Sequence, residues 1–350
     1  MFTYKNSDNV GRVMDLLRNN GVEDPEKVVN KYPKLVEMDL QKKLDEMKEK
    51  GFEQPAKIIR RWPFIVRVDL DKAMERMKNA GFENPAKMIE RFPISATLDF
   101  SRVIIEFNNA GFQNPIELIK RRPDIAGRKI KEILERFEKA GFDNPKELIE
   151  RNPKVVSVDI KRVIKDMKEA GFADPVKLIE KSPNISCTNI KKAVDRIKSA
   201  GLSDPVSLIE RFPPIATLKI DRVIAGLDEI GFQNTLKIIE SMPSIAGLKK
   251  EAIEKKVEYY SSYGIEIADI ERFPQLLLLG MQSKVEPRLS YIESKTNSKD
   301  VKKLGVSLRM LLDGNDETFI NTLKSCGLEA RIEEYKAKAK NNISKLLRND

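Results

Sequence analysis

The chain has 350 residues, of which 41% are apolar and 34% charged, and it contains two cysteines and no histidine. Without histidine there are no imidazole general bases, no Ser–His or Cys–His nucleophiles and no imidazole metal ligands. Cys187 and Cys326 are too few and too far apart in sequence for a cysteine zinc cluster. We therefore predict that the protein is not an enzyme and has no cofactor, no metal and no small-molecule substrate. Both thiols are expected to stay reduced in a reducing intracellular compartment.

The charge balance favours a polyanionic partner. Lys and Arg total 64 against 54 Asp and Glu, a formal net charge of +10. Such a surplus is typical of proteins that bind nucleic acid or anionic membranes. The longest apolar run, Leu276 to Leu279, is far shorter than the roughly 18–20 residues that a membrane helix needs. We expect nucleic acid, and no membrane, as the partner.

A 30-residue repeat dominates the chain from its start. A proline recurs eight times from Pro33 to Pro243, and a glycine recurs eight times from Gly21 to Gly231, without insertion or deletion. A unit of this length cannot close its own core, so neighbouring units must bury each other's apolar faces. The period predicts an all-α, right- or left-handed superhelical solenoid of about 30-residue repeats, each with two α-helices and a short 3₁₀ turn.

The repeats set the expected domain organisation. Residues 1–20 are predicted to form an N-terminal capping helix, and residues 21–263 eight repeats. Residues 264–293 form an irregular terminal repeat, because Gly264 and Pro274 are ten residues apart rather than twelve. Residues 294–350 are expected to be a C-terminal helical cap with a Lys-rich tail, beginning with a polar loop at 294–300.

Residues 141–170 illustrate the first helix of each repeat. Asn144 followed by Pro145 is typical of an N-cap and the first helical position. The short helix must end before Pro153, which starts a turn or a single 3₁₀ turn. The same cap position holds these residues in the other repeats: Asp24, Gln54, Asn84, Asn114, Asp174, Asp204 and Asn234. Gln54 is the only poor cap among them.

The second helix begins after Asp159, and its apolar residues from Ile160 to Met167 form one stripe. Equivalent caps are Asp39, Asp69, Asp99 and Asn189, whereas Lys129, Lys219 and Lys249 break the rule. Gly171 is predicted to take a left-handed C-terminal position. The apolar residue that follows, Phe172, could stack on a base, but an aromatic after a helix-ending glycine usually locks adjacent helices. We assign it and its equivalents to the core: Val22, Phe52, Phe82, Phe112, Phe142, Leu202 and Phe232.

Two basic ladders are candidates for contact with phosphates. The first ladder lies two residues before the second proline of each repeat and is interrupted at Ser241: Lys31, Arg61, Arg91, Arg121, Arg151, Lys181, Arg211 and Arg272. The second ladder lies on the long helix: Lys42, Lys72, Arg102, Arg162, Lys192 and Arg222. Lys284 and Arg288 are a further pair. A stripe of cations suits a phosphate backbone, and guanidinium suits bidentate contact.

Each ladder also has a structural interpretation. The first lies in the last turn of a helix, where a cation is stabilised by the helix dipole. The second lies opposite the apolar stripe, where solvated Lys and Arg are ordinary. Positions 34 and 37 and their equivalents vary strongly between repeats. That variation is compatible with a code of one repeat per base, as in other helical repeats, or with drift at exposed positions.

The repeat, as in GFENPAKMIERFP, resembles that of the mitochondrial transcription termination factor (mTERF) family. The closing FPQLLLLGMQSKVEPRL and the later LLDGNDETF are similar to the end of that family's domain, and the resemblance covers residues 8 to about 325. It implies a curved superhelix that binds nucleic acid, often duplex DNA, along a basic groove. It also implies the mitochondrial matrix or a plastid for a typical member, and otherwise the cytoplasm or nucleoid.

We therefore expect a non-catalytic protein that holds double-stranded DNA in a basic concave groove, in transcription termination or regulation. The alternatives are an RNA-binding helical-repeat protein and a scaffold for a protein partner. A capped solenoid is expected to be a monomer, unless the apolar segment 275–281 is left uncovered.

Overall fold

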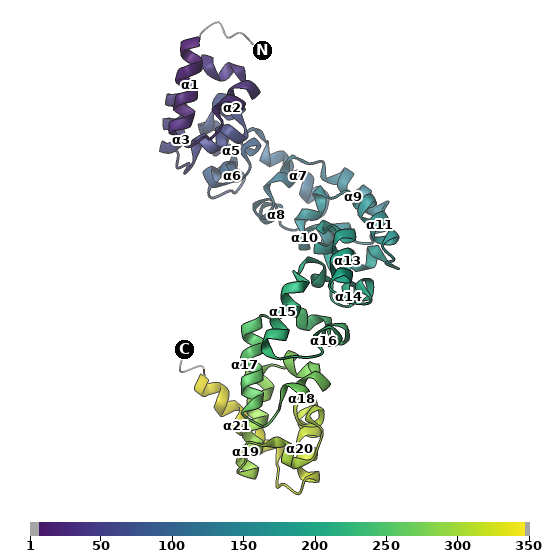
Figure 1. Ribbon diagram of the computed structural model, residues 1–350. Helices are drawn as coiled ribbons and strands as arrows, with labels where there is room; N and C mark the ends of the chain where they lie inside the picture. The colour runs from purple at the N-terminus through teal and green to yellow at the C-terminus, as the bar shows by residue number, and fades with distance from the viewer. Residues whose placement is uncertain (1–6, 347–350) are drawn as a thin grey trace. The chain divides into compact units, whose positions relative to one another are not determined.

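The computed structural model describes residues 7–346, and every regular element within them is a helix or helical turn joined by short connections (Figure 1). The predicted all-α solenoid of helical repeats is confirmed. The chain divides into two compact units, Met1–Lys161 and Arg162–Asp350, each built from the same repeat. No helix within the described residues has the length and apolar character needed to cross a bilayer.

Each repeat has the three predicted elements. The first helices are α2 (Pro25–Lys31), α4 (Pro55–Arg61), α6 (Pro85–Arg91), α8 (Pro115–Arg121), α10 (Pro145–Arg151), α12 (Pro175–Lys181), α14 (Pro205–Arg211) and α16 (Thr235–Ser241). The 3₁₀ turns are η1 (Pro33–Glu37), η2 (Pro63–Arg67), η3 (Pro93–Thr97), η4 (Pro123–Gly127), η5 (Pro153–Ser157), η6 (Pro183–Cys187), η7 (Pro213–Thr217) and η8 (Pro243–Gly247). The second helices are α3 (Leu40–Glu49), α5 (Leu70–Asn79), α7 (Phe100–Asn109), α9 (Ile130–Glu138), α11 (Ile160–Glu169), α13 (Ile190–Ser199), α15 (Ile220–Ile230) and α17 (Lys250–Ser261).

The elements before and after the repeats are helical as well. Helix α1 (Ser7–Asn19) contacts α2, α3 and η1. After α17 follow α18 (Ile267–Arg272), η9 (Pro274–Leu278), a π-helical turn η10 (Met281–Val285), α19 (Glu286–Thr296), η11 (Val301–Leu304), a second π-helical turn η12 (Arg309–Asp313), α20 (Asp316–Ser325) and α21 (Ile332–Leu346). Residues 1–6 of the expected N-terminal cap and residues 347–350 of the expected tail lie outside the described residues.

The loop expected at 294–300 begins later than predicted, because α19 continues to Thr296. The hydroxyls of Ser294 and Thr296 donate hydrogen bonds to the carbonyls of Tyr291 and Ile292, so these polar side chains stay within the helix. Asn297, with φ of 51°, then ends it.

Helix caps form largely as the sequence predicts. The side chain of Asn144 accepts a hydrogen bond from the backbone N–H of Glu147, and Gln54 makes no capping bond. Asn234 departs from the prediction, because its side-chain amide donates to Glu271 instead of capping α16. The second helices are capped by Asp39, Asp69, Asp99 and Asn189, and have no side-chain cap at Lys129, Lys219 and Lys249.

The glycine ladder follows α1 and seven of the second helices and ends them in left-handed backbone. All eight glycines have φ between 82° and 108°. At Gly51, the N–H donates to the carbonyl of Lys48 while the N–H of Phe52 donates to that of Met47, the two bonds of a Schellman motif. Phe52 and its equivalents are at most 4% exposed, which confirms that this column belongs to the core. A column of isoleucines on the first helices, such as Ile59 and Ile89, is fully buried beside it.

Removing a cap tests this account of the helix starts. We expect Asp69→Ala to lower the free energy of unfolding by about 1 kcal/mol, because the N–H of Lys72 loses its acceptor. Gln54→Ala, at a position without a capping bond, should leave the urea midpoint unchanged. Equal midpoints for both variants would contradict the capping role of Asp69.

Candidate nucleic-acid interface

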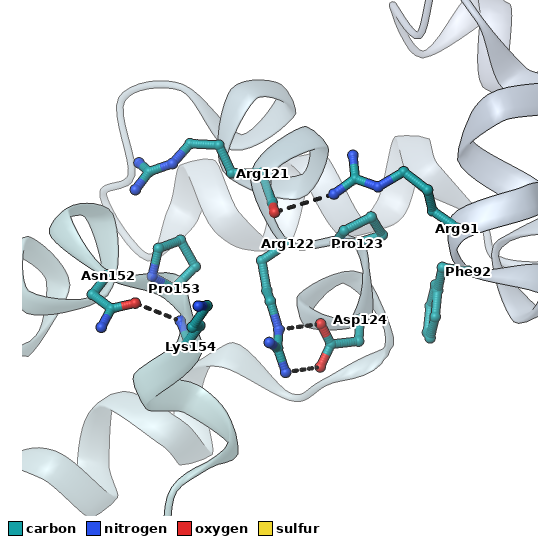
Figure 2. A pocket seen from close by; sticks show the side chains of 9 residues that line it. All are labelled: Arg91, Phe92, Arg121, Arg122, Pro123, Asp124, Asn152, Pro153 and Lys154. Carbon is teal, nitrogen blue, oxygen red and sulfur yellow. Dashed lines mark hydrogen bonds and ion pairs between the residues drawn. The ribbon is translucent and has the colours of Figure 1, made fainter. Parts of the chain in front are cut away.

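A hollow of about 410 Å³ in the first unit brings first-ladder residues together (Figure 2). It is lined by residues from three successive repeats, at the C-terminal ends of α6, α8 and α10 and in the turns η4 and η5: Arg91, Phe92, Arg121, Arg122, Pro123, Asp124, Asn152, Pro153 and Lys154. Apart from Pro123 and Pro153, these residues recur at three positions around the proline: the ladder residue, the residue after it, and the residue after the proline. We call the surface formed by these three positions the turn surface. In the first unit, η2 contacts η3 and η3 contacts η4, so the surface runs from one repeat to the next.

Four of the exposed first-ladder arginines are hydrogen-bonded to the following repeat. In Arg121, Nη1 lies 2.6 Å from the carbonyl oxygen of Glu150 and Nη2 lies 3.1 Å from that of Arg151. Arg61 reaches the carbonyls of Glu90 and Arg91 in the same way, at 2.6 and 2.8 Å. Four equivalent contacts follow: Arg91 to Lys120 and Arg121, and Arg211 to Glu240 and Ser241. Lys31 makes a single, longer bond of 3.5 Å to Arg61.

These bonds change the structural interpretation of the ladder. The acceptors are the last two carbonyls of the next first helix, so each arginine caps the C-terminus of its neighbour as well as ending its own helix. A guanidinium has five N–H donors, and these bonds use two. The side chain is thus held in one direction while donors remain to meet an incoming anion.

A row of glutamates completes the link between repeats. Oε1 of Glu90 accepts hydrogen bonds from the backbone N–H groups of Glu53, at 2.6 Å, and Gln54, at 3.2 Å. Glu271 accepts equivalent bonds from Gln233 and Asn234. Helices α4 and α16, which lack a side-chain cap of their own, therefore receive a carboxylate from the next repeat. The charge of these glutamates is directed at helix N-termini, where it is stabilised by the helix dipole.

The same contacts shift the acidity of the carboxyls. Hydrogen bonds from the backbone N–H and the hydroxyl of Ser203 hold the pKa of Glu240 below its ordinary value. Burial raises the pKa of Glu271, but the bonds from Asn234 and Gln233 outweigh it and the pKa lies below normal. Both groups are ionised at neutral pH, so the link between repeats is intact there.

A family model described as mTERF matches residues 2–320, most of the chain. The chain belongs to the mTERF family. Its members are helical-repeat proteins that generally bind nucleic acid, are known as non-catalytic, and are typically organellar. No curated protein matches the chain.

The second ladder of this mTERF chain lies apart from the hollow, and none of its residues lines it. Lys72 and Arg102 have side chains that are 79% and 77% exposed, and they form ion pairs with Asp69, the N-cap of α5, and with Glu106 on α7. Arg162 pairs with Asp166 at 3.8 Å. The remaining members, Lys42, Lys192 and Arg222, are exposed too. Exposed pairs of this kind contribute little energy and leave a mixed-charge face.

The pair from the family's closing element lies differently from the expectation. Arg288 is 1% exposed; its Nη1 donates to the carbonyl of Leu311 at 3.1 Å and its Nη2 lies 2.9 Å from Oδ1 of Asp316. The guanidinium carbon lies 4.9 Å from the ring centre of Phe319. Protein groups surround the Arg288 guanidinium, which argues against the prediction that this side chain contacts a polyanion. Lys284 is partly exposed and donates to the carbonyl of Asp313 at 2.6 Å.

In the second unit, Arg272 is the ladder residue after the interruption. It lines a hollow of about 350 Å³ with Asn234, Lys237, Ser241 and Glu271, among others. Arg151, Lys181 and Arg211 are exposed at the equivalent position of their repeats. The side chains of the first ladder are therefore all exposed to solvent. Ser241 is the position at which a repeat lacks a first-ladder cation.

Proposed function

We propose that the protein binds double-stranded DNA along the turn surface through phosphate contacts, as a non-catalytic factor in transcription termination or regulation. The observation that carries this proposal is the row of exposed first-ladder arginines, of which Arg61, Arg91, Arg121 and Arg211 are each held by two hydrogen bonds to the next repeat. Side chains held in advance lose less entropy when they bind, and bidentate guanidinium contacts suit phosphate oxygens. The net charge of +10 supports attraction over longer distances.

The proposal is tested by fluorescence anisotropy with duplex DNA, single-stranded DNA and structured RNA, each titrated with salt. We expect the logarithm of the affinity for duplex DNA to fall with the logarithm of salt concentration, with a slope of about −0.9 per phosphate neutralised. Weak binding of all three at roughly 0.15 M salt would contradict the proposal. A scaffold for a protein partner would then be favoured. Tighter binding of structured RNA would favour the RNA-binding alternative.

We further propose that the protein acts as a monomer in a reducing compartment, the mitochondrial matrix or a plastid if it is a typical member of the family. Leu276 and Leu277, in the apolar segment that we considered as an interface, are fully buried, which leaves Leu278 as its exposed leucine, at 37%. Cys187 and Cys326 are both free thiols, in keeping with a reducing environment.

A further inference from the structure

The turn surface changes character along the first unit. In repeats four and five, the residue after the ladder and the residue after the proline are polar, and Arg122 forms an ion pair with Asp124 (Figure 2). In repeats two and three the same positions hold Trp62, Phe64, Phe92 and Ile94. The surface is therefore apolar over two repeats, although its ladder of arginines continues.

Two of these apolar side chains lie open to solvent. Phe64 is 47% exposed and Ile94 is 43% exposed, whereas the aromatic residues at the repeat boundaries are at most 4% exposed. The ring centre of Phe64 lies 4.6 Å from that of Tyr32 and 6.3 Å from that of Trp62. Full burial of such a side chain is worth about 1.5–3 kcal/mol, so leaving nearly half of each in water forgoes roughly half of that, and an exposed pair is a candidate binding surface.

The repeat symmetry places these side chains side by side. Asp124 and Lys154, the equivalents of Phe64 and Ile94, line one hollow together with Arg91 and Arg121. The turns η2 and η3 that carry Phe64 and Ile94 contact each other directly. We call Trp62, Phe64 and Ile94 the apolar step.

Cations accompany the apolar step on the same surface. Arg61 is the last residue of the first helix of its repeat, immediately before Trp62, and its guanidinium donates hydrogen bonds to the carbonyls of Glu90 and Arg91. Lys34 occupies the position of Phe64 in the preceding repeat, and Arg67 ends the turn that carries Phe64; both are exposed. Aromatic side chains beside fixed cations are the combination by which proteins hold a single strand, with bases stacked and phosphates neutralised.

A regular duplex cannot use the apolar step, because its bases already stack on each other and offer no free face to Phe64. A protein partner would gain from the apolar area but would also have to neutralise the surrounding arginines. An unpaired strand meets both requirements, because each nucleotide carries a base that can stack on an aromatic ring and a phosphate that can neutralise an arginine.

We propose that the apolar step binds a single-stranded segment of nucleic acid, with unpaired bases stacked on Phe64 and Trp62 and the adjoining phosphates on Arg61 and Arg91. This inference rests on the proposed nucleic-acid function and specifies the form of the ligand at repeats two and three. It assigns base stacking to Trp62 and Phe64, which belong to neither basic ladder.

Trp62 is the only tryptophan of the chain, so its intrinsic fluorescence reports directly on the apolar step. The probes are an oligodeoxythymidine and an oligouridine of about 12 nucleotides, and an abasic strand of the same length with the same phosphates. We expect both base-bearing strands to quench Trp62 at saturation, and the abasic strand to bind more weakly without quenching. The oligouridine arm distinguishes RNA from DNA as the source of the strand.

Phe64→Ala separates stacking from phosphate contact while keeping Trp62 as the probe. We expect it to raise the Kd for the base-bearing strands by roughly 5- to 100-fold, the effect of losing one stacked base, and to leave that for the abasic strand within about twofold. Ile105→Ala is the matched control, because Ile105 is 58% exposed on α7 in the same unit and lies outside the turn surface. It should leave all three affinities unchanged.

The outcomes distinguish the two proposals. Equal affinity for base-bearing and abasic strands, or saturation without quenching, would overturn stacking while leaving phosphate binding intact. Salt-dependent binding of duplex DNA alone would likewise overturn the single-strand inference and keep the proposed function. Failure of every nucleic acid to bind would overturn both.

Discussion

Replacing Arg61, Arg91 and Arg121 together by serine is expected to lower the affinity for duplex DNA by about 100-fold at roughly 0.15 M salt. The three side chains are adjacent rungs of the first ladder in one unit, and each has donors left over for a phosphate. Losing three phosphate contacts should also make the salt slope shallower by about 2.7. Serine is the natural choice, because Ser241 occupies this position in α16 and the helix forms with it. Anisotropy at several salt concentrations measures both quantities.

The stability of the triple variant has to be measured as well, because each arginine also holds two carbonyls of the next repeat. A lost charged hydrogen bond costs about 1.5–3 kcal/mol, so binding should be compared at a temperature at which circular dichroism reports a folded protein. The matched control is the serine variant of Lys42, Lys72 and Arg102, which removes the same charge from the second ladder. Equal loss of affinity in both variants would mean that net charge alone attracts DNA, and would contradict the turn surface as the site.

The interrupted rung allows the converse experiment. Ser241→Arg is expected to steepen the salt slope by about 0.9, because it adds one phosphate contact to the hollow that contains Arg272. The change introduces a cation at an exposed helix end, where the other first helices already carry an arginine or a lysine, so unfolding should be little affected. An unchanged slope would argue that the surface beside Arg272 does not meet DNA.

Much of the fold could be predicted from the sequence, because the residues that determine local structure recur in every repeat. Three residues determine where the elements of each repeat begin and end. The proline starts the 3₁₀ turn, the glycine with positive φ ends a helix, and the apolar residue after that glycine packs into the core. Because these residues recur every 30 positions, the same helix ends and turns recur along the chain. Asn234 departs from its predicted role because its partner, Glu271, lies in the next repeat, and capping arguments consider only the helix that follows.

The candidate site was predictable only in part, because its partners are backbone carbonyls that leave no trace in the sequence. The ladder was visible as charge, but the bond from Arg121 to the carbonyl of Glu150 was not. A further column on the second helices escaped notice for the same reason. Arg76, Arg136 and Arg196 each donate through Nη2 to a carbonyl twenty residues ahead. The apolar step was hidden as well, since Phe64 and Ile94 appeared as variable positions whose exposure only the packing of the turns determines.

Arg288 is the residue for which burial and the sequence-based interpretation disagree, and its removal is expected to destabilise the fold. We expect Arg288→Ala to lower the free energy of unfolding by about 1.5–3 kcal/mol, because the carbonyl of Leu311 loses its buried donor and the face of Phe319 loses its cation, whereas Asp316 is 42% exposed and water can solvate its carboxylate. Urea unfolding followed by circular dichroism measures the loss. Lys284→Ala removes a partly exposed cation from the same region and should cost far less.

Arg288→Lys separates the effect of the charge from that of the guanidinium geometry. Lysine keeps the positive charge but lacks the planar group that hydrogen-bonds to Leu311 and Asp316 at the same time. We expect the lysine variant to remain destabilised, by less than the alanine variant. The affinity of the folded fraction for duplex DNA should stay the same in both variants, since a side chain that is 1% exposed offers nothing to a phosphate. Normal stability combined with lost DNA binding would instead mean that Arg288 acts at the nucleic acid. The C-terminal cap would then belong to the interface rather than only closing the core.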